Sequence, residues 1–278
     1  MNLGIHAGIA GGLVNAAHEA ERKGCTTFQI FTKSPQQWAA NDLVTSGVDL
    51  FKEAVKAYKL SPVIVHTSYL LNLASLDPEL LKKSIDSFAI EIRRAEAVGA
   101  DYITTHIGSC GECDKKEALE RILKAIQEAV ALSRSEKIGI LFENSAKIKS
   151  PGGELKDLAL LVKQCGKRYG ITLDTCHAFA AGYDFREQNV LKICLKEVAE
   201  IAGPANVKVV HLNDSKGELG SGLDRHEHLG EGTLGQEGLS NVVNDSSLKN
   251  AAFILETPKE PEGSDVRNLE YARKLSKK

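Results

Sequence analysis

The sequence lacks most of the features that mark specialised protein classes. No apolar run approaches the roughly 18 residues that a membrane-spanning helix needs. The 7 prolines and 24 glycines show no period, which excludes collagen-like and low-complexity proteins. Neither sign of charge dominates, because 35 Lys and Arg face 37 Asp and Glu for a net charge of −2. This balance excludes a globally basic, histone-like nucleic-acid binder, although it leaves room for a local positive site.

Two further absences concern the cellular compartment. The first residues carry neither the basic start nor the long apolar stretch of a signal peptide, so we expect a cytoplasmic protein without membrane contact. We therefore expect the six cysteines to be mostly reduced core thiols. Cys110 and Cys113 have the spacing of half a zinc knuckle or of a redox pair, but no second matching pair accompanies them. We interpret them as two thiols in a loop.

What the sequence does contain is a repeated pattern of a short apolar run, a polar tip, a loop and a helical segment. Apolar runs this continuous are typical of parallel strands buried on both faces. Eight units in 278 residues give about 35 residues per unit, a usual size for a βα unit. This alternation predicts the α/β class and a closed (β/α)8 TIM barrel, with residues 1–278 as one domain. The candidate strands are residues 3–7, 27–32, 62–66, 102–106, 139–143, 170–174, 207–211 and 252–256.

Helix boundary signals lie between these strands. Asp77 followed by Pro78 is typical of a helix start, and Gly99 closes that helix. Asp114 precedes another helical pattern, and the first helix is expected near residues 13–23.

Two long excursions follow the second and seventh strands. Residues 34–49 contain the only tryptophan, Trp38, and residues 215–235 are rich in glycine. Because the loops after barrel strands lie on the catalytic face, both excursions are candidates for substrate contact.

Six successive candidate strands end in a side chain that can bind a metal. Strand ends of a barrel converge on one mouth, so side chains from different units meet there. His177 follows three residues after one of these ends, and the glycine-rich excursion holds Asp224 and His226. The six strand-end residues are His66, His106, Glu143, Asp174, His211 and Glu256. With His177, Asp224 and His226 they make five histidines and four carboxylates. This set of nitrogen and oxygen donors favours zinc, with manganese or iron as alternatives.

Each of these residues taken alone is more often a hydrogen-bonding group than a metal ligand. As a set, they would place unpaired charges in one mouth, which is costly unless metal ions compensate them. Three divalent ions beside four carboxylates would leave a local charge of about +2, which suits an anionic group such as phosphate. Of the remaining histidines, we expect His18 on the surface and His228 in a solvated loop. His6 either supports the metal site or simply packs.

Distinctive segments are spread over nearly the whole chain. They are residues 4–6, 10–13, 31–38, 66–70, 174–184, 211–214, 224–226, 229–232 and 254–257. In these segments the sequence resembles the endonuclease IV family, the zinc-dependent apurinic/apyrimidinic endonucleases of DNA base-excision repair. The stretches DTCHAFAAGYD and HLNDS are long, which makes the resemblance specific.

The resemblance implies a trinuclear zinc site that uses all nine candidate ligands, with Glu143 bridging two ions. The implied sets are His66, His106 and Glu143; then Glu143, Asp174, His211 and Glu256; and finally His177, Asp224 and His226. The implied reaction hydrolyses the phosphodiester 5′ to an abasic site, leaving a 3′-hydroxyl and a 5′-deoxyribose phosphate. It would also remove blocking groups from damaged 3′ ends. Metal-bound hydroxide would be the attacking group, with Glu143 as the catalytic carboxylate.

The implied partner is double-stranded DNA that contains abasic sites or blocked 3′ ends. It would be bound by a monomer, associated with the nucleoid if the source is bacterial. Loops of the second and third units would contact the minor groove through Gln36, Gln37 and Tyr69. Some relatives carry arginine where this chain has Gln36, which puts DNA affinity and its salt dependence in question.

Two alternatives remain open. A sugar isomerase or epimerase on the same barrel would use a smaller metal set, comparable to Glu143, Asp174, His211 and Glu256, and would have no evident need for the other five candidates. A non-catalytic protein that binds damaged DNA would be marked by loss of a metal ligand, and none of the nine is lost.

Overall fold

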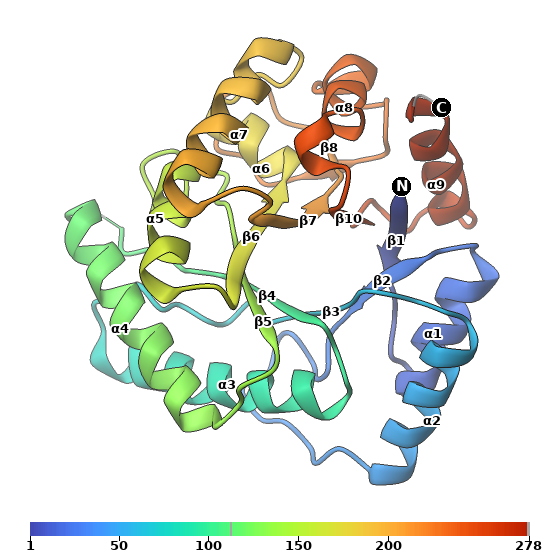
Figure 1. The fold of residues 1–278 in the computed structure, drawn as a ribbon, viewed down its shortest axis with the longest axis vertical. Helices are drawn as coiled ribbons and strands as arrows, with labels where there is room; N and C mark the ends of the chain where they lie inside the picture. Colours follow the sequence, from blue (N-terminus) through green and yellow to red (C-terminus); the bar gives the residue numbers. More distant parts are fainter. Residues whose placement is uncertain (112, 277–278) are drawn as a thin grey trace.

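Eight parallel strands close into a barrel in the order β1, β10, β7, β6, β5, β4, β3, β2 (Figure 1). The structure is a computed structural model that describes residues 1–111 and 113–276. Every predicted strand is present, with ends that agree within two residues, so the α/β class and the TIM barrel are confirmed. The assignment of residues 1–278 to one domain stays a prediction. The strands are β1 (Asn2–His6), β2 (Thr27–Ile30), β3 (Val63–His66), β4 (Tyr102–His106), β5 (Gly139–Glu143), β6 (Tyr169–Asp174), β7 (Val207–His211) and β10 (Ala252–Leu255).

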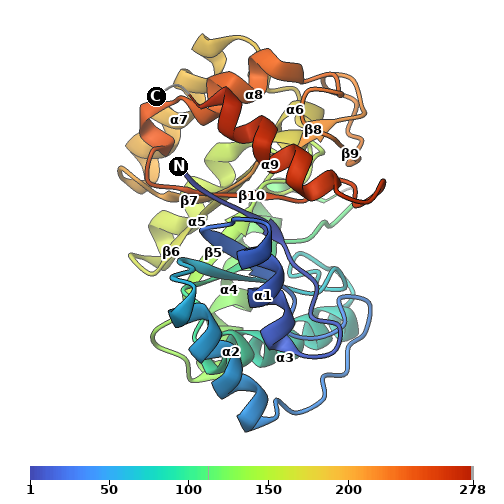
Figure 2. The same ribbon diagram turned by 90° about the vertical axis from the view of Figure 1, so that its right-hand side faces the viewer.

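Helices form a ring around the barrel, and Figure 2 shows the barrel from the side of β1 and α9. The Asp77 carboxylate accepts the Glu79 N–H at 2.9 Å and caps the helix that begins at Pro78, as predicted. Asp114 caps the next helix in the same way. Among the described residues, none of the helices has the length and apolar character needed to cross a membrane. The ring helices are α1 (Leu13–Arg22), α2 (Thr45–Ala57), α3 (Pro78–Ala97), α4 (Lys115–Ser133), α5 (Leu155–Cys165), α7 (Gln188–Ala202), α8 (Gly235–Val243) and α9 (Ser264–Leu275).

The interior of the barrel is packed with side chains from strands on opposite sides. One apolar cluster joins β3, β5, β7 and β10, while the Thr104 and Thr172 hydroxyls bond to each other at 2.9 Å across β4 and β6. A filled interior leaves the carboxyl ends of the strands as the place where polar side chains can meet. The cluster consists of Ile64, Leu141, Val209, Ala252 and Ile254.

Three local elements differ from the sequence expectation. The first excursion is shorter than residues 34–49, because α2 already begins at Thr45. The second excursion contains the antiparallel pair β8 (Asp214–Ser215) and β9 (His226–Glu227), at the right-hand edge of Figure 2. A short helix, α6 (Thr175–Ala181), follows β6 without a loop because the Asp174 carboxylate caps it by accepting the His177 N–H at 2.7 Å.

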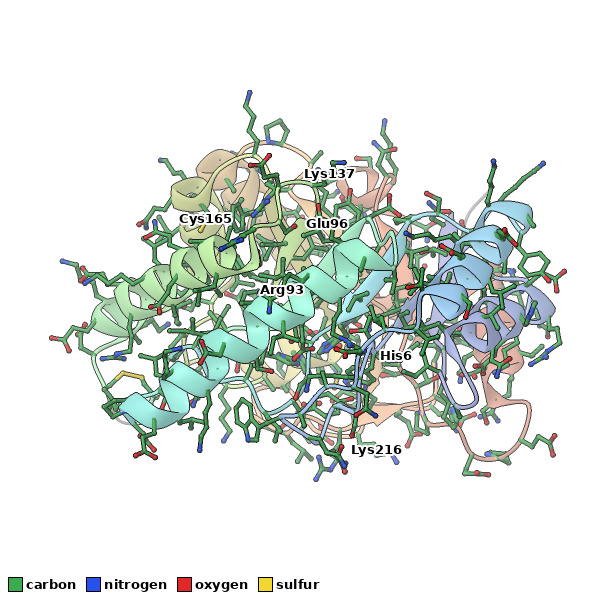
Figure 3. All side chains as sticks on the ribbon, turned by 90° about the horizontal axis from the view of Figure 1, so that it is seen from below. His6, Arg93, Glu96, Lys137, Cys165 and Lys216 are labelled. Atoms are coloured by element: carbon green, nitrogen blue, oxygen red, sulfur yellow. A yellow bond between two sulfur atoms is a disulfide. The ribbon has the colours of Figure 1, made fainter. Side chains whose placement is uncertain are left out.

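The interpretation of Cys110 and Cys113 as two thiols was wrong, because they form a disulfide in the loop between β4 and α4. Figure 3 shows this bond at the edge of the molecule. The loop brings the two Cα atoms to 5.8 Å, within the range that a disulfide spans. Glu112, between them, lies outside the described residues. The other four cysteines are free thiols, as expected, and Cys25, Cys176 and Cys194 are buried.

Candidate metal centre

The strand ends enclose a cavity of about 510 Å³ at the mouth of the barrel. Asp174 and His211, the two candidate ligands that do not line it, are fully buried beside the others. Arg225 and Lys259 also line this cavity and add positive charge. The candidate ligands on its wall are His66, His106, Glu143, His177, Asp224, His226 and Glu256.

Glu143 lies at the centre of these side chains. Its Oε2 is 3.1 Å from His66 Nε2 and 3.5 Å from His106 Nε2. Its Oε1 is 3.0 Å from His211 Nδ1 and 3.5 Å from His177 Nδ1. The two oxygens of one carboxylate thus face different histidines. The potential ligand atoms of Glu143, His66 and His106 lie within 4.8 Å of one another, which is close enough to hold one ion.

A second group of donors surrounds His211. Its Nδ1 lies 3.2 Å from Glu256 Oε2 and 3.9 Å from Asp174 Oδ2. Together with Glu143, these four residues place ligand atoms within 4.8 Å of one another. Glu143 therefore belongs to two adjacent groups.

A third group forms around Asp224. Its Oδ1 lies 3.1 Å from His177 Nε2 and 3.4 Å from His226 Nε2. Two overlapping sets of ligand atoms meet the same distance limit: Asp174, His177 and His226 in one, and Cys176, Asp224 and His226 in the other.

Cys176 was not predicted as a site residue, although it lies between two candidates in the sequence. Burial raises the pKa of its thiol to about 12, and the sulfur donates to the Arg225 carbonyl at 3.6 Å. The predicted donor set of the mouth consists of nitrogen and oxygen atoms, and Cys176 adds one sulfur atom beside Asp224 and His226.

Backbone carbonyls orient three of the histidines. The Nδ1–H groups of His66, His177 and His226 point to the carbonyls of Thr67 at 2.7 Å, of Asn144 at 3.0 Å and of Glu256 at 3.0 Å. A proton on Nδ1 leaves the lone pair on Nε2, the atom that faces the neighbouring carboxylates. The buried Nε2 of His226 has no hydrogen-bond partner among the described residues. An unpaired buried nitrogen of this kind suits a metal ligand.

The carboxylates and imidazoles of the mouth shift one another's pKa values. Burial alone would raise the pKa of Glu143, but the imidazoles of His106 and His211 hold it well below its usual range. Burial likewise disfavours the charged form of His211, yet the carboxylates of Glu256 and Glu143 raise its pKa to about 9. Four carboxylates this close together need positive charge nearby, and metal ions at the three groups would supply it.

The three remaining histidines have different surroundings. His6 lines the cavity with Nδ1 3.2 Å from Glu256 Oε1, so it supports a candidate ligand. His18 bonds the Tyr58 hydroxyl at 2.9 Å, between α1 and α2 and outside the cavity lining. The expectation of a solvated His228 was wrong. Its ring is buried because the Glu260 carbonyl and the Asn268 side-chain amide each bond one of its nitrogens at 3.0 Å.

Of the three candidate DNA-contacting residues, Tyr69 lines the cavity, whereas Gln36 and Gln37 lie outside its lining. Gln36 and Gln37 are exposed in the loop after β2. Tyr69 is 61% exposed in the loop after β3, with its ring centroid 5.3 Å from that of Phe31 and 6.0 Å from that of His66. Tyr69 is therefore placed to meet a ligand in the mouth, and the Pro35 carbonyl accepts the Tyr69 N–H at 3.2 Å, which ties the loop of Gln36 and Gln37 to the loop of Tyr69.

Sequence reasoning missed Asp214, which holds the glycine-rich loop. Its carboxylate accepts four backbone N–H groups, those of Ser215, Gly230, Gly232 and Gly235, at 2.8 to 3.1 Å. These bonds fix both ends of the segment that carries Asp224 and His226. The signal in the sequence was an aspartate directly before a glycine-rich stretch, which does not reveal which N–H groups it binds.

Known proteins resemble this chain over most of its length. A family model described as a xylose isomerase-like TIM barrel matches residues 17–275. A probable endonuclease 4 of Halothermothrix orenii is 41% identical over 263 residues, covering 93% of this chain and 94% of that protein. Its counterpart in Methanoculleus marisnigri is 38% identical over 277 residues, covering 99% and 98%.

Solved structures also resemble this chain over nearly its whole length. The crystal structure of endonuclease IV from Thermus thermophilus superposes with a TM-score of 0.88 at 38% identity, covering 99% of this chain and 98% of that one. A D-tagatose 3-epimerase-like protein, with a TM-score of 0.73 at 19% identity and coverage of 99% and 97%, shares the fold alone.

Proposed function

The chain belongs to the endonuclease 4 family of xylose isomerase-like TIM barrels, and from that membership we propose that it is a metal-dependent endonuclease of DNA repair. Its substrate is double-stranded DNA with an abasic site, and it hydrolyses the phosphodiester on the 5′ side. The products are a 3′-hydroxyl and a 5′-deoxyribose phosphate. The same site removes blocking groups from damaged 3′ ends, and the enzyme acts as a monomer.

The observation that carries this proposal is the position of Glu143. One buried carboxylate faces His66 and His106 with one oxygen and His211 and His177 with the other. Glu143 would therefore help to hold an ion in each of the two groups to which it belongs. We assign a third ion to the adjacent group, which consists of His177, Asp224 and His226.

Zinc fits these nine nitrogen and oxygen donors, with manganese or iron as substitutes. When bound, the three ions would supply a nucleophile at neutral pH and stabilise charge on the phosphate and the leaving oxygen. The chain's own contribution is to hold the ligands in place. The carbonyls of Thr67, Asn144 and Glu256 fix three histidine rings, so that each presents Nε2.

The cavity suits an extruded abasic nucleotide. Its volume of about 510 Å³ accommodates a sugar and its phosphate, and Arg225 and Lys259 on its wall attract the negative charge. An abasic nucleotide has no base to unstack, so its extrusion costs less than that of a normal nucleotide. The duplex would be contacted by Gln36, Gln37 and Tyr69. These contacts would stabilise the DNA with its abasic nucleotide extruded.

The two alternatives make different use of the same mouth. A sugar isomerase or epimerase would employ the group around His211 and would leave His66, His106, His177, Asp224 and His226 without a task. A protein that only binds damaged DNA would need no complete set of metal ligands. Both alternatives are outcomes of the experiment described next.

The experiment is an incision assay on a duplex oligonucleotide that carries one tetrahydrofuran abasic analogue. This analogue cannot undergo β-elimination, so a break in the strand must come from hydrolysis. We expect incision 5′ to the analogue without added metal, an end that a polymerase extends, loss of activity after chelation and recovery with zinc. The same duplex with an ordinary nucleotide is the control and should stay intact. Binding without incision would favour the damage-binding alternative, and ketose epimerisation without incision would favour the sugar enzyme.

A further inference from the structure

Gln29 is a fully buried amide in β2 that contacts two of the candidate metal ligands. Its Nε2 donates to Glu256 Oε1 at 2.7 Å, and its Oε1 lies 2.9 Å from His211 Nε2. Glu256 follows β10 and His211 ends β7, so one side chain of β2 contacts the ends of two strands that are not its neighbours in the barrel. Gln29 belongs to none of the predicted ligand sets and has no role in the proposed reaction.

The hydrogen-bonding capacity of the groups fixes the orientation of the amide. An ionised carboxylate only accepts hydrogen bonds, so the group that faces Glu256 must be the NH2 of Gln29. The amide oxygen of Gln29 then faces His211, and a carbonyl-type oxygen only accepts. The proton of that bond must therefore come from Nε2 of His211.

In the neutral imidazole that binds a metal, a proton on Nε2 leaves the lone pair of His211 on Nδ1. This atom lies 3.0 Å from Glu143 Oε1 and 3.2 Å from Glu256 Oε2, inside the second donor group. His66, His177 and His226 have the opposite arrangement, with Nδ1 bonded to a backbone carbonyl. Among these four histidines, His211 alone presents Nδ1, and Gln29 is the group that sets it.

We propose that Gln29 is a positioning residue of the metal centre, which selects Nδ1 of His211 as the ligand atom and aims Glu256 at the same ion. By binding Oε1 of Glu256, it leaves Oε2 directed toward His211 Nδ1. The inference rests on the proposed function, because it requires a resident metal ion in the second group. Groups that orient metal ligands in this way typically change metal affinity by about 10- to 100-fold when they are removed.

The test compares zinc binding by the full chain and by Gln29→Met, which keeps the volume and removes the hydrogen bonds to Glu256 and His211 together with the contact to His6 Nδ1. Each protein is equilibrated with zinc in a graded series of chelator concentrations, and bound metal per chain is measured. We expect one of the bound ions to be lost from Gln29→Met at a free zinc concentration about 10- to 100-fold higher than from the wild type. Gln29→Leu should behave alike and serves if the methionine variant does not fold.

Thr104→Val is the matched control, since it removes a buried hydrogen bond in the barrel interior, to Thr172, that touches no ligand. It should keep all its zinc at wild-type affinity. Thermal unfolding of the metal-free proteins separates a positioning role from a structural one, because Gln29→Met should be no less stable there than Thr104→Val. Equal zinc affinity of Gln29→Met and the wild type would overturn the inference alone. Absence of zinc from the wild type would overturn the proposed metal centre and this inference with it.

Discussion

The Lys33 ammonium lies 3.7 Å from Glu91 Oε1, and both side chains are almost completely buried behind the mouth of the barrel. Lys33 also donates to the carbonyl of Gln37, and Glu91 accepts the Ser68 N–H at 2.9 Å. The Ser68 hydroxyl in turn donates to the Pro35 carbonyl at 2.9 Å. The loop with Gln36 and Gln37 and the loop with Tyr69 are thus attached to one buried ion pair.

Because of this ion pair, we expect DNA binding to depend on Glu91, although Glu91 is not one of the proposed metal ligands. Glu91→Gln removes the charge that compensates Lys33, which should loosen both loops. We expect KM for the abasic duplex to rise roughly tenfold, about 1.4 kcal/mol, with little change in kcat because the metal ligands are untouched. Glu96→Gln on the same helix, labelled in Figure 3, is the control and should leave KM unchanged. An unaltered KM for Glu91→Gln would show that the loops hold their places without the pair.

We expect Gln36 to determine part of the salt dependence of DNA binding. Gln36→Arg adds one positive charge on an exposed loop that would face the duplex. Binding measured by anisotropy at several salt concentrations should become tighter at low salt, with a slope of log K against log salt steeper by about one. Gln36→Met adds no charge and should leave the slope as it is. The same slope for arginine and methionine would place Gln36 away from the phosphates.

We expect both the order of the glycine-rich loop and the retention of metal to depend on Asp214. Asp214→Asn removes the charge and one of the two acceptor oxygens that hold four backbone N–H groups. We expect the free energy of unfolding in urea to fall by about 2 kcal/mol or more. One zinc should also be released more readily, because Asp224 and His226 lie in that loop. Asp245→Asn, which removes a single capping charge beside Ser247, should cost about 1 kcal/mol and no metal. Full metal retention by Asp214→Asn would break the proposed link.

The metal-free protein should lose stability as the pH rises through the range set by His211. Against the cost of burial, the carboxylates of Glu256 and Glu143 raise the pKa of His211 from a usual value of 6.5 to about 9. Its stabilising contribution is therefore complete below pH 6.5 and is lost between pH 6.5 and about 9. Urea unfolding of chelator-treated protein at both ends of this range measures the loss. The loss should shrink in His211→Asn. A flat profile in the wild type would mean that the imidazole is not paired with these carboxylates.

The sequence predicted the barrel and the proximity of the candidate ligands because both follow from local patterns. Continuous apolar runs with a polar tip define each strand, and barrel closure then brings His66 and Glu143 together although 77 positions separate them. Contacts between distant polar groups leave no such pattern. Gln29 and His211 are 182 positions apart, and nothing in the run TFQIF shows that its amide faces an imidazole.

Other errors have the same physical origin. His228 was expected in solvent because its own loop is polar, yet the Asn268 amide meets its ring from α9. The Cys110–Cys113 disulfide depends on the backbone path of a short loop, which the spacing of two cysteines does not fix. Asp214 looked like one more polar loop residue, because the N–H groups that it accepts lie up to 21 positions away.

The most direct test of the central claim is a zinc titration of the metal-free protein, with the rate of incision 5′ to the abasic analogue measured at each ratio. Glu143 is placed to join two groups of ligands, and a third group adjoins them. The rate should therefore rise with added zinc and saturate at three equivalents per chain. Saturation at one equivalent, or no incision at any ratio, would contradict the account.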